Sequence, residues 1–329
     1  MSENFGRIVK LTIFDKDPIE KGTDLKGVEI EFLKIDFEVK KTSSKDPNHC
    51  RIDITNCSQN TIAYLEKIGN IAILEVGYAG LDGTGKPTVL FTGNIVRFDP
   101  PGDVAVDEVV SIEVRDGYLE YRDTRISVYK DVGASALSVL KEIVSYFKLP
   151  VENLPVIEDK VYVNGYSYTG KLREAMDRVC RYLNLGWSIQ NRRVRIFKKG
   201  ETYTKQFYHL NYDSGLEFCG RKSITEDDRK KATKRKTKST KLTKKDKTDF
   251  VLPSDNEKLK VQGVVVKTRL NPLLLPGDTV KITSKIIDGD FYSIDDIEYR
   301  GSNVDNEFYC RFTAKIIKKW MIIVFWYKR

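Results

Sequence analysis

Residues 307–316, EFYCRFTAKI, carry the clearest structural signal in the sequence. Apolar side chains occupy every second position from Phe308 to Ile316, and polar side chains or tyrosine occupy most positions between them. Because neighbouring side chains of a β-strand point to opposite faces, this alternation predicts a strand with one buried and one wet face. Antiparallel sheets commonly contain such strands, so the C-terminal third is expected to be β-structure.

Similar short strands are expected in both outer thirds of the chain. They cover 28–39, 50–54, 71–78, 89–97 and 109–115 in the N-terminal third, and 207–212, 259–268, 279–284, 291–299 and 307–316 in the C-terminal third. The alternation over 28–39 changes phase after Phe32, which predicts a β-bulge. A short helix is expected after Ser58, a residue type that caps helices. Short strands separated by turns, with a bulge, favour small closed barrels.

The middle of the chain has helical periodicity instead. Apolar residues recur four, three and four positions apart over 136–147 and again over 172–183, and Gly186 is the expected stop of the second helix. Two further strands are expected at 187–190 and 194–197. The predicted fold class is therefore mainly β with an α+β insertion. Two small tube-like β-barrels, at 1–117 and 202–329, flank a central α+β domain at 118–201. The turn formers Pro101-Gly102-Asp103 and Pro276-Gly277-Asp278 hint that the two β-units are similar.

Basic residues are concentrated in one short segment. The chain has a formal net charge of +9. The segment 221–248 carries that whole excess, so the remainder is formally neutral. We interpret 221–256 as a Lys/Thr-rich loop that interrupts the second barrel. Its candidate electrostatic contacts, with DNA, lipid headgroups or an acidic protein, are Lys230, Lys231, Lys234, Arg235 and Lys236. No aromatic residue lies between Arg221 and Thr248 to stack on bases, which favours a solvated loop.

The C-terminal stretch 320–327, WMIIVFWY, is apolar and flanked by basic residues. Eight residues are far fewer than the ~20 that span a bilayer, so no membrane insertion is expected. The stretch either continues the last strand into the core or docks on a neighbouring subunit, and we favour docking. The candidate partner contacts are Trp320, Ile322, Val324, Phe325 and Trp326. The N-terminus has no pattern of a secretory signal, so a soluble protein made in the cytoplasm is expected.

Motifs for catalysis and metal binding are weak. Gly80, Gly85 and Lys86 match part of a phosphate-binding loop, but Pro87 replaces its Ser/Thr and a strand follows instead of a helix. We therefore interpret 80–88 as a hairpin turn. The two histidines lie outside metal-binding spacings, and the five cysteines contain no CxxC pair. No carboxylate pair lies across a recognisable cleft. We expect no catalytic residue, no metal and no cofactor.

Several stretches together resemble a known family. They are GVEIEF at 27–32, Pro47-Asn48, LEVGYAG at 74–80, FTGNI at 91–95, GVVV at 263–266, Leu270-Asn271-Pro272 and LPGD at 275–278. The combination is similar to the baseplate hub proteins of contractile bacteriophage tails and tail-derived bacteriocins, relatives of late-control D and VgrG-type hubs. The basic segment 221–248 and the apolar C-terminal stretch depart from that pattern.

The resemblance implies a structural role without enzymatic activity. A homotrimer would form a ring of six barrels, with a tail tube protein or tube initiator above it and the central spike below. Baseplate wedge proteins and the tape-measure protein are possible further partners. DNA would pass through the channel only in transit, and 221–248 is expected to face away from the channel axis. The protein would be made in the host cytoplasm and assembled into the tail. Two alternatives stay open: a tail-associated protein acting on peptidoglycan or polysaccharide, and a nucleic-acid-binding protein that uses 221–248.

Overall fold

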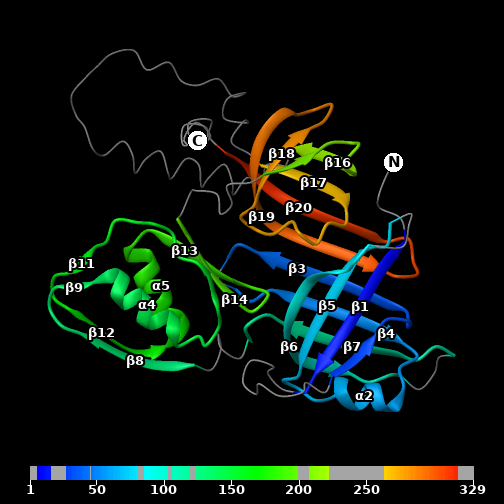
Figure 1. Ribbon diagram of the computed structural model, residues 1–329, viewed down its shortest axis with the longest axis horizontal. Helices are drawn as coiled ribbons and strands as arrows, with labels where there is room; N and C mark the ends of the chain where they lie inside the picture. Colours follow the sequence, from blue (N-terminus) through cyan, green and yellow to red (C-terminus); the bar gives the residue numbers. More distant parts are fainter. Residues whose placement is uncertain are drawn as a thin grey trace.

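The computed structural model describes residues 6–15, 27–44, 46–80, 85–102, 106–118, 124–198, 207–221 and 263–317. Strands make up 54% of these residues and helices 12%, which confirms the mainly β fold class. Figure 1 shows two neighbouring groups of strands and, beside them, a smaller group in which helices pack with strands. We call these groups the first β-region (7–115), the second β-region (207–316) and the central unit (125–198).

The described residues of the first β-region form seven strands and one short helix. The elements are β1 (Arg7–Phe14), β2 (Gly27–Ile30), β3 (Ile35–Thr42), β4 (His49–Thr55), α2 (Gln59–Leu65), β5 (Ile71–Tyr78), β6 (Thr88–Asp99) and β7 (Val109–Arg115). Their order in the sheet is β3-β4-β7-β6-β5-β1-β2. Helix α2 begins as expected after Ser58, whose hydroxyl accepts a hydrogen bond from the Thr61 N–H at 3.2 Å. Leu65 at its end is fully buried in the core of the sheet.

One strand expected in this region is in fact two. β2 ends at Ile30 and pairs with β1, whereas β3 begins at Ile35 and pairs with β4. The change of phase after Phe32 therefore marks a bend between strands and not a bulge within one. Phe32 lies in that bend and is 97% exposed. Strand β1, which pairs with both β2 and β5, was absent from the expected strands.

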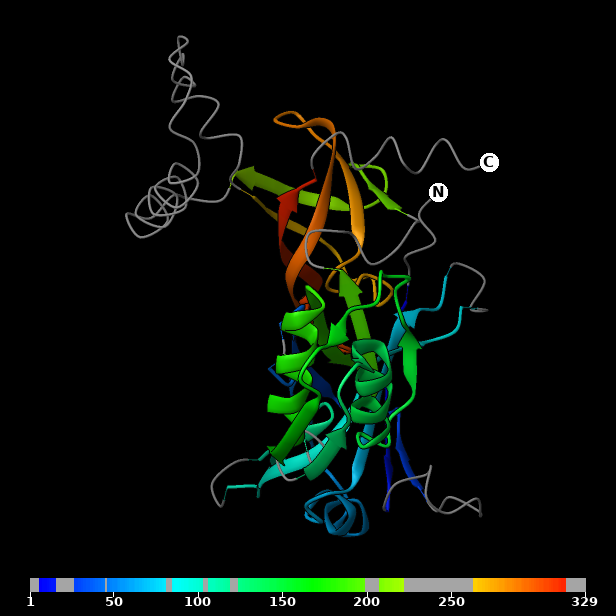
Figure 2. The ribbon, with the colours of Figure 1, turned by 90° about the vertical axis from the view of Figure 1, so that its left-hand side faces the viewer.

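The central unit packs two helices beside short sheets. Its elements are β8 (Arg125–Lys130), β9 (Ala134–Ser135), α4 (Ala136–Ser145), β10 (Val151–Asn153), β11 (Val161–Tyr162), β12 (Tyr166–Lys171), α5 (Leu172–Tyr182), β13 (Leu185–Gln190) and β14 (Arg193–Lys198). Figure 2 shows α4 and α5 next to each other. Their apolar faces share one buried cluster, in which the rings of Phe147 and Trp187 lie 5.5 Å apart. The expected stop at Gly186 is wrong: Asn184 takes the left-handed conformation after α5 (φ 58°), and Gly186 lies in β13 against the Phe197 ring.

The described residues of the second β-region form six strands. They are β15 (Phe207–Leu210), β16 (Leu216–Arg221), β17 (Val264–Arg269), β18 (Thr279–Thr283), β19 (Asp288–Ser302) and β20 (Phe308–Ile316). The alternation that predicted β20 is confirmed, since Phe308, Cys310, Phe312 and Ala314 are buried. β16 was absent from the expected strands. It pairs with β17 on one side and forms one end of the sheet order.

The two β-regions form one continuous sheet. β3 of the first region pairs with β19 of the second, so thirteen of the described strands are joined in a single hydrogen-bonded network. The closed barrels expected from the sequence are therefore not formed by the described residues. The strand path runs from β16 to β2 without returning on itself. Both edges of β3 are occupied, by β4 and by β19, so β3 is not available to close the first β-region on itself.

The two β-regions repeat one topology. The order β5-β6-β7-β4-β3 matches β18-β19-β20-β17-β16, and every neighbouring pair in both series is antiparallel. The register shifts after Leu74 in β5 and after Ile282 in β18. It shifts again after Ile95 in β6 and after Ile294 in β19. Because bulges are specific features of a fold, their recurrence at matching places indicates a structural repeat.

The turn before the first strand of each series, β5 and β18, repeats in atomic detail. The Gly69 N–H donates to the Ile95 carbonyl at 2.9 Å, and the Ile95 N–H donates to the Asn70 carbonyl at 2.8 Å. The same two bonds join Gly277, Ile294 and Asp278 at 2.8 and 3.0 Å. Gly69 and Gly277 have φ of 98° and 89°. The counterpart of Gly277 is therefore Gly69, and not Gly102 as the sequence hinted.

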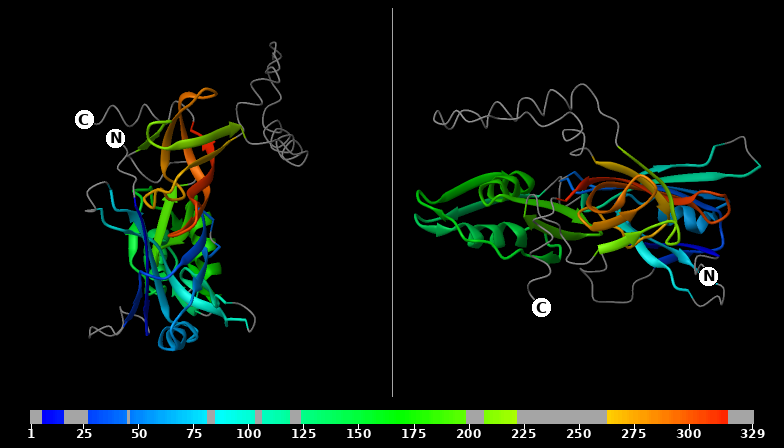
Figure 3. Two further views of the ribbon diagram at one scale, coloured as in Figure 1. Left: turned by 90° about the vertical axis from the view of Figure 1, so that its right-hand side faces the viewer. Right: turned by 90° about the horizontal axis from the view of Figure 1, so that it is seen from above.

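The register fixes which residues correspond. One row crosses the first β-region and a matching row crosses the second: Ile95, Val114, Cys50 and Val39, against Ile294, Ala314, Val264 and Arg221. One buried cluster extends through both β-regions, and a separate cluster fills the central unit. Figure 3 shows the central unit at one end of the molecule, beside the sheet. The domain limits 1–117, 118–201 and 202–329 stay a prediction.

Candidate functional site

The joint between the β-regions, which we call the seam, is the first candidate. Seven residue pairs join β3 to β19, from Thr42 opposite Asp296 to Asp36 opposite Ser302. Val39 and Tyr299 face each other in it and are fully buried. On the wet face Arg300 donates to Glu38 across the seam at 3.2 Å. A ladder of this length with a buried face fixes the two β-regions relative to each other.

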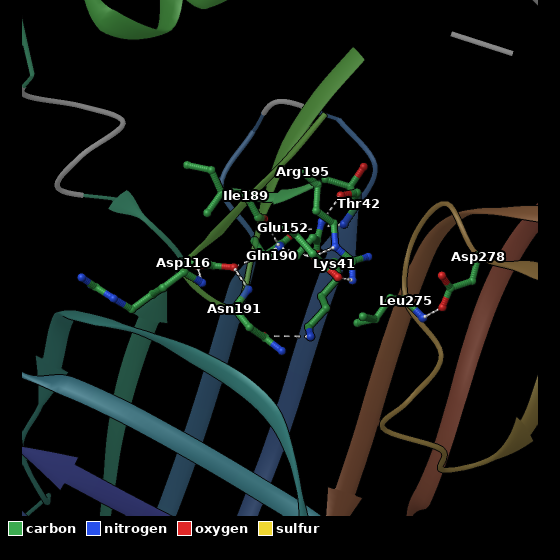
Figure 4. A network of polar contacts seen from close by, with 12 residues as sticks. Lys41, Thr42, Asp116, Glu152, Ile189, Gln190, Asn191, Arg195, Leu275 and Asp278 are labelled. Carbon is green, nitrogen blue, oxygen red and sulfur yellow. Dashed lines mark hydrogen bonds and ion pairs between the residues drawn. The ribbon is translucent and has the colours of Figure 1, made fainter. Parts of the chain in front are cut away.

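The second candidate is a polar junction between the central unit and the first β-region. The tip of the β13–β14 hairpin, Asn191-Arg192, has two consecutive left-handed residues with φ of 51° and 58°. Such a turn matches the twist of a hairpin and directs successive N–H groups to one side. The Asp116 carboxylate accepts both N–H groups, at 2.5 and 2.7 Å (Figure 4). Asp116 follows β7 directly, so it fastens the hairpin tip to the sheet.

Two amide side chains complete the junction. The Asn48 Nδ2 donates to the Ile189 carbonyl and to Gln190 Oε1, both at 2.9 Å. The Gln190 Nε2 in turn donates to the Thr42 carbonyl at 2.8 Å. Asn48 and Gln190 are both buried. A buried amide costs free energy unless it is hydrogen-bonded, so these bonds hold the hairpin in one position.

Lys41 connects the junction to the seam. It lies in β3 opposite Ile297 of β19, and its side chain is buried between the two β-regions. The Nζ donates to the Leu90 carbonyl at 2.5 Å and to Asn191 Oδ1 at 3.1 Å. Burial lowers the pKa of Lys41 to about 8, and the nearby Asp116 carboxylate opposes this shift. The ammonium group is therefore held inside the protein by oxygen acceptors from two separate regions.

Carboxylates on both sides of Lys41 have raised pKa values. Burial raises the pKa of Asp116 to about 6, against the stabilising N–H bonds from the hairpin tip. Burial also raises the pKa of Asp278 to about 6, and the Leu275 N–H that donates to it at 2.9 Å works in the opposite direction. Arg195 of β14 attracts Asp278 and pairs with Glu152 through two hydrogen bonds. Electrostatic attraction between Arg195 and Asp278 therefore also connects the central unit with the second β-region.

The arrangement of these side chains suits a structural role, which is to hold the three regions in fixed relative positions. Its carboxylates, amides and lysine bond to one another and to main-chain atoms of three regions, so they connect the regions rigidly. Among the described residues, no group of three or more His, Cys, Asp or Glu side chains is placed to hold a metal ion. In the same part of the chain no helix has the length and apolar character needed to cross a membrane.

Several of the candidate motifs and residues identified in the sequence lie in the described part of the chain. β5 and β6 pair antiparallel, with Val76 opposite Thr88, so a strand follows this stretch as expected, and residues 81–84 of the predicted hairpin turn lie outside the described residues. His49 lies in β4, 3.8 Å from Glu113, and His209 lies in β15 beside Thr283. They belong to different β-regions. The candidate contacts Lys230, Lys231, Lys234, Arg235 and Lys236, and Trp320, Ile322, Val324, Phe325 and Trp326, lie outside the described residues.

Sequence reasoning missed the polar junction. The strands expected at 187–190 and 194–197 require a turn between them, but its partners Asn48 and Asp116 are far away in sequence, and no pattern connects them with it. One available signal was Lys41, which occupies a position in β3 where the alternation Ile35, Phe37, Val39 calls for an apolar residue. A charged residue in the buried phase of a strand indicates a polar partner inside the protein.

Comparisons with known proteins bear on the fold. No protein-family model and no curated protein matches the chain. A 43 kDa tail protein of prophage MuSo2 from Shewanella oneidensis matches in structure with a TM-score of 0.58 at 11% identity, over 94% of this chain and 98% of that one. A tail protein from Neisseria meningitidis matches with a TM-score of 0.56 at 11% identity, over 97% and 99%.

A third similar structure comes from a secretion system. The c3393 protein of E. coli, described as a type VI secretion component with structural similarity to the T4 tail proteins gp27 and gp5, matches with a TM-score of 0.51. It is 9% identical, over 87% of this chain and 74% of that one. The sequence resemblance to tail hubs is therefore confirmed at the level of the fold: the chain has the fold of phage tail proteins and of their type VI secretion relatives.

Proposed function

We propose that the protein is a structural hub of a phage or phage-like contractile tail. Three copies would form a ring that joins the sixfold tail tube to the threefold central spike and surrounds part of the channel. The observation that carries this proposal is the repeat within one chain: β5-β6-β7-β4-β3 matches β18-β19-β20-β17-β16, bulges included. Three chains then supply six similar β-regions, while each chain supplies one central unit.

This arrangement resolves a mismatch of symmetry. The six β-regions would present similar surfaces to a hexameric tube protein or tube initiator, and the three central units would give the other side threefold symmetry. The seam supports the proposal, because it sets the two β-regions of a chain at a fixed relative position. Wedge proteins and the tape-measure protein are further partners that we propose, with DNA only in transit. The role needs no enzymatic activity.

Assembly of the purified full-length chain tests the proposal. We expect a three-chain mass in native mass spectrometry and rings with six lobes in negatively stained images. A chain that stays monomeric at every concentration, or forms only a twofold dimer, would contradict it. Clearing of cell-wall material in a zymogram would instead support the peptidoglycan alternative. Retention on duplex DNA that is lost on deletion of 221–248 would support the nucleic-acid alternative.

A further inference from the structure

The wet face of the second β-region carries an apolar patch where β20 ends. The rings of Phe207 in β15 and Phe291 in β19 meet edge to face, with their centroids 5.1 Å apart. Ile317 lies beside them, since its N–H donates to the Phe291 carbonyl at 2.9 Å. We call these three residues the phenylalanine patch. Phe207 is 51% exposed, and neighbouring apolar side chains that are exposed together indicate a surface that another segment covers.

The matching place in the first β-region is covered by the central unit. The repeat aligns Ile317 with Gly117, which follows β7 as Ile317 follows β20. A Cβ at Gly117 would lie 2.9 Å from the Ile189 side chain, so β13 packs directly against this position. In the neighbouring strand β6, Asn94 Oδ1 accepts a hydrogen bond from Arg192 of the hairpin tip at 3.0 Å. The chain that follows β7 thus returns to cover the end of its own β-region.

The two matching places differ in chemistry. Asp116, which binds the polar hairpin tip, corresponds to Ile316, and Thr92 corresponds to Phe291. The chain that follows β20 differs in the same direction, because it contains the apolar stretch WMIIVFWY at 320–327. We infer that this stretch covers the phenylalanine patch of its own chain, as the central unit covers the matching place in the first β-region.

The short tether favours the same copy over a neighbouring one. Trp320 is three residues past Ile317, so at ~3.6 Å per residue it lies within about 11 Å of the patch residue. A segment tethered by a short linker has an effective concentration of roughly millimolar. Free copies of a purified protein are far more dilute than that. The sequence alone favoured docking on a neighbouring subunit, whereas the position of the patch favours cover within one chain.

Photo-crosslinking tests which surface the stretch meets. A benzophenone amino acid in place of Phe207, in the full-length chain, is expected to crosslink to 320–327. Copies labelled with heavy isotopes are mixed with unlabelled ones, so crosslinks within one copy join peptides of the same isotope. The control carries the probe in place of Phe32, which is 97% exposed in the first β-region, and is expected to give no crosslink to 320–327.

Tryptophan quenching by acrylamide gives a second readout. Trp187 is buried, so a change in quenching reports on Trp320 and Trp326. The variant Phe207→Asp places a charge in the patch and is expected to raise the quenching constant about twofold, because an unpaired carboxylate resists burial. Phe32→Asp is the matched control and should leave the constant unchanged.

The isotope pattern distinguishes cover within one chain from docking on a neighbour. Crosslinks from the probe at Phe207 to 320–327 of the same copy, with increased quenching in Phe207→Asp, support the inference. Crosslinks to 320–327 that mix isotopes would place the stretch on a neighbouring copy and overturn it. Crosslinks to other segments only, or equal quenching in the two aspartate variants, would overturn it as well. Both readouts work on a single chain, so their failure is distinct from a failure of the proposed ring.

Discussion

The two β-regions have the same strand order but differ in what their matching edges meet. In the first region the edge strand β3 carries Val39, which is buried opposite Tyr299. In the second, the matching edge strand β16 carries Arg221, which is exposed. The bulges and turns of the backbone thus recur in both β-regions, whereas the type of side chain at matching positions depends on what lies beside it. Where the edge is covered the residue is apolar, and where it is open the residue is charged.

The same difference appears at the repeated turn. Asn70 and Asp278 occupy matching positions, with the same main-chain bonds to Ile95 and Ile294. The Asn70 side chain donates to the Tyr64 carbonyl at 3.0 Å, within its own region. Asp278 lies near Arg195 of the central unit, which attracts it. Asp278, the charged residue of this matching pair, therefore lies in the turn that is close to the central unit.

The largest expected effect comes from the matched substitutions Val39→Asp and Arg221→Asp. The first places a carboxylate in the buried seam and removes an apolar side chain, so the free energy of unfolding should fall by about 4 kcal/mol. The second changes an exposed edge position, where about 0.5 kcal/mol or less is expected in the isolated chain. Urea denaturation followed by circular dichroism measures both. Similar losses for the two variants would mean that the edges are equivalent.

A smaller effect is expected from pH. The folded pKa values of Asp116 and Asp278 are raised to about 6, above the ordinary value of 3.8, so the folded state binds protons more tightly than the unfolded state. Stability should therefore increase as pH falls from 7 to 5, by about 1 kcal/mol for each group. His49, whose pKa is lowered by burial, acts in the opposite direction and is shared by every variant.

Substitution assigns this pH dependence. Asp278→Asn, which copies the first β-region's Asn70, should remove about half of the increase in stability between pH 7 and pH 5. The control Asp99→Asn changes a partly exposed carboxylate and should leave the increase as it is. Denaturation midpoints at the two pH values give the result. An unchanged slope in Asp278→Asn would show that this carboxyl group does not titrate in that range.

The smallest effect is expected at the two turn glycines. Gly69→Ala and Gly277→Ala each force a Cβ into a left-handed conformation, with a cost of about 1 kcal/mol. Because the two turns have the same main-chain bonds, the losses should agree. Gly102→Ala is the control, since a Cβ there meets nothing within 4 Å and no left-handed φ is required. Thermal melts of the three variants would show whether the turns are energetically equivalent.

Periodicity predicted most of the strands and both long helices, because alternation and helical spacing are local properties of the sequence. The bounds of β5 (Ile71–Tyr78) and β7 (Val109–Arg115) agree with the predicted ones. The closed barrels were wrong because closure depends on which edges pair, and β3 meets β19 from the far end of the chain. The polar junction was missed for the same reason, since Asp116 and the hairpin tip lie 75 residues apart.

The seam also has a consequence for synthesis. Its strands β3 and β19 are separated by more than two hundred residues, so the first edge leaves the ribosome long before its partner exists. At ~5–20 residues per second the interval is roughly ten to fifty seconds. During that time the outer edge of β3, which includes Val39, is unpaired and exposed in the nascent chain, close to other nascent chains on the same messenger RNA. We therefore expect chaperones to bind this exposed edge during synthesis. We also expect the last folding step to be slow, because it pairs two strands that are far apart in sequence.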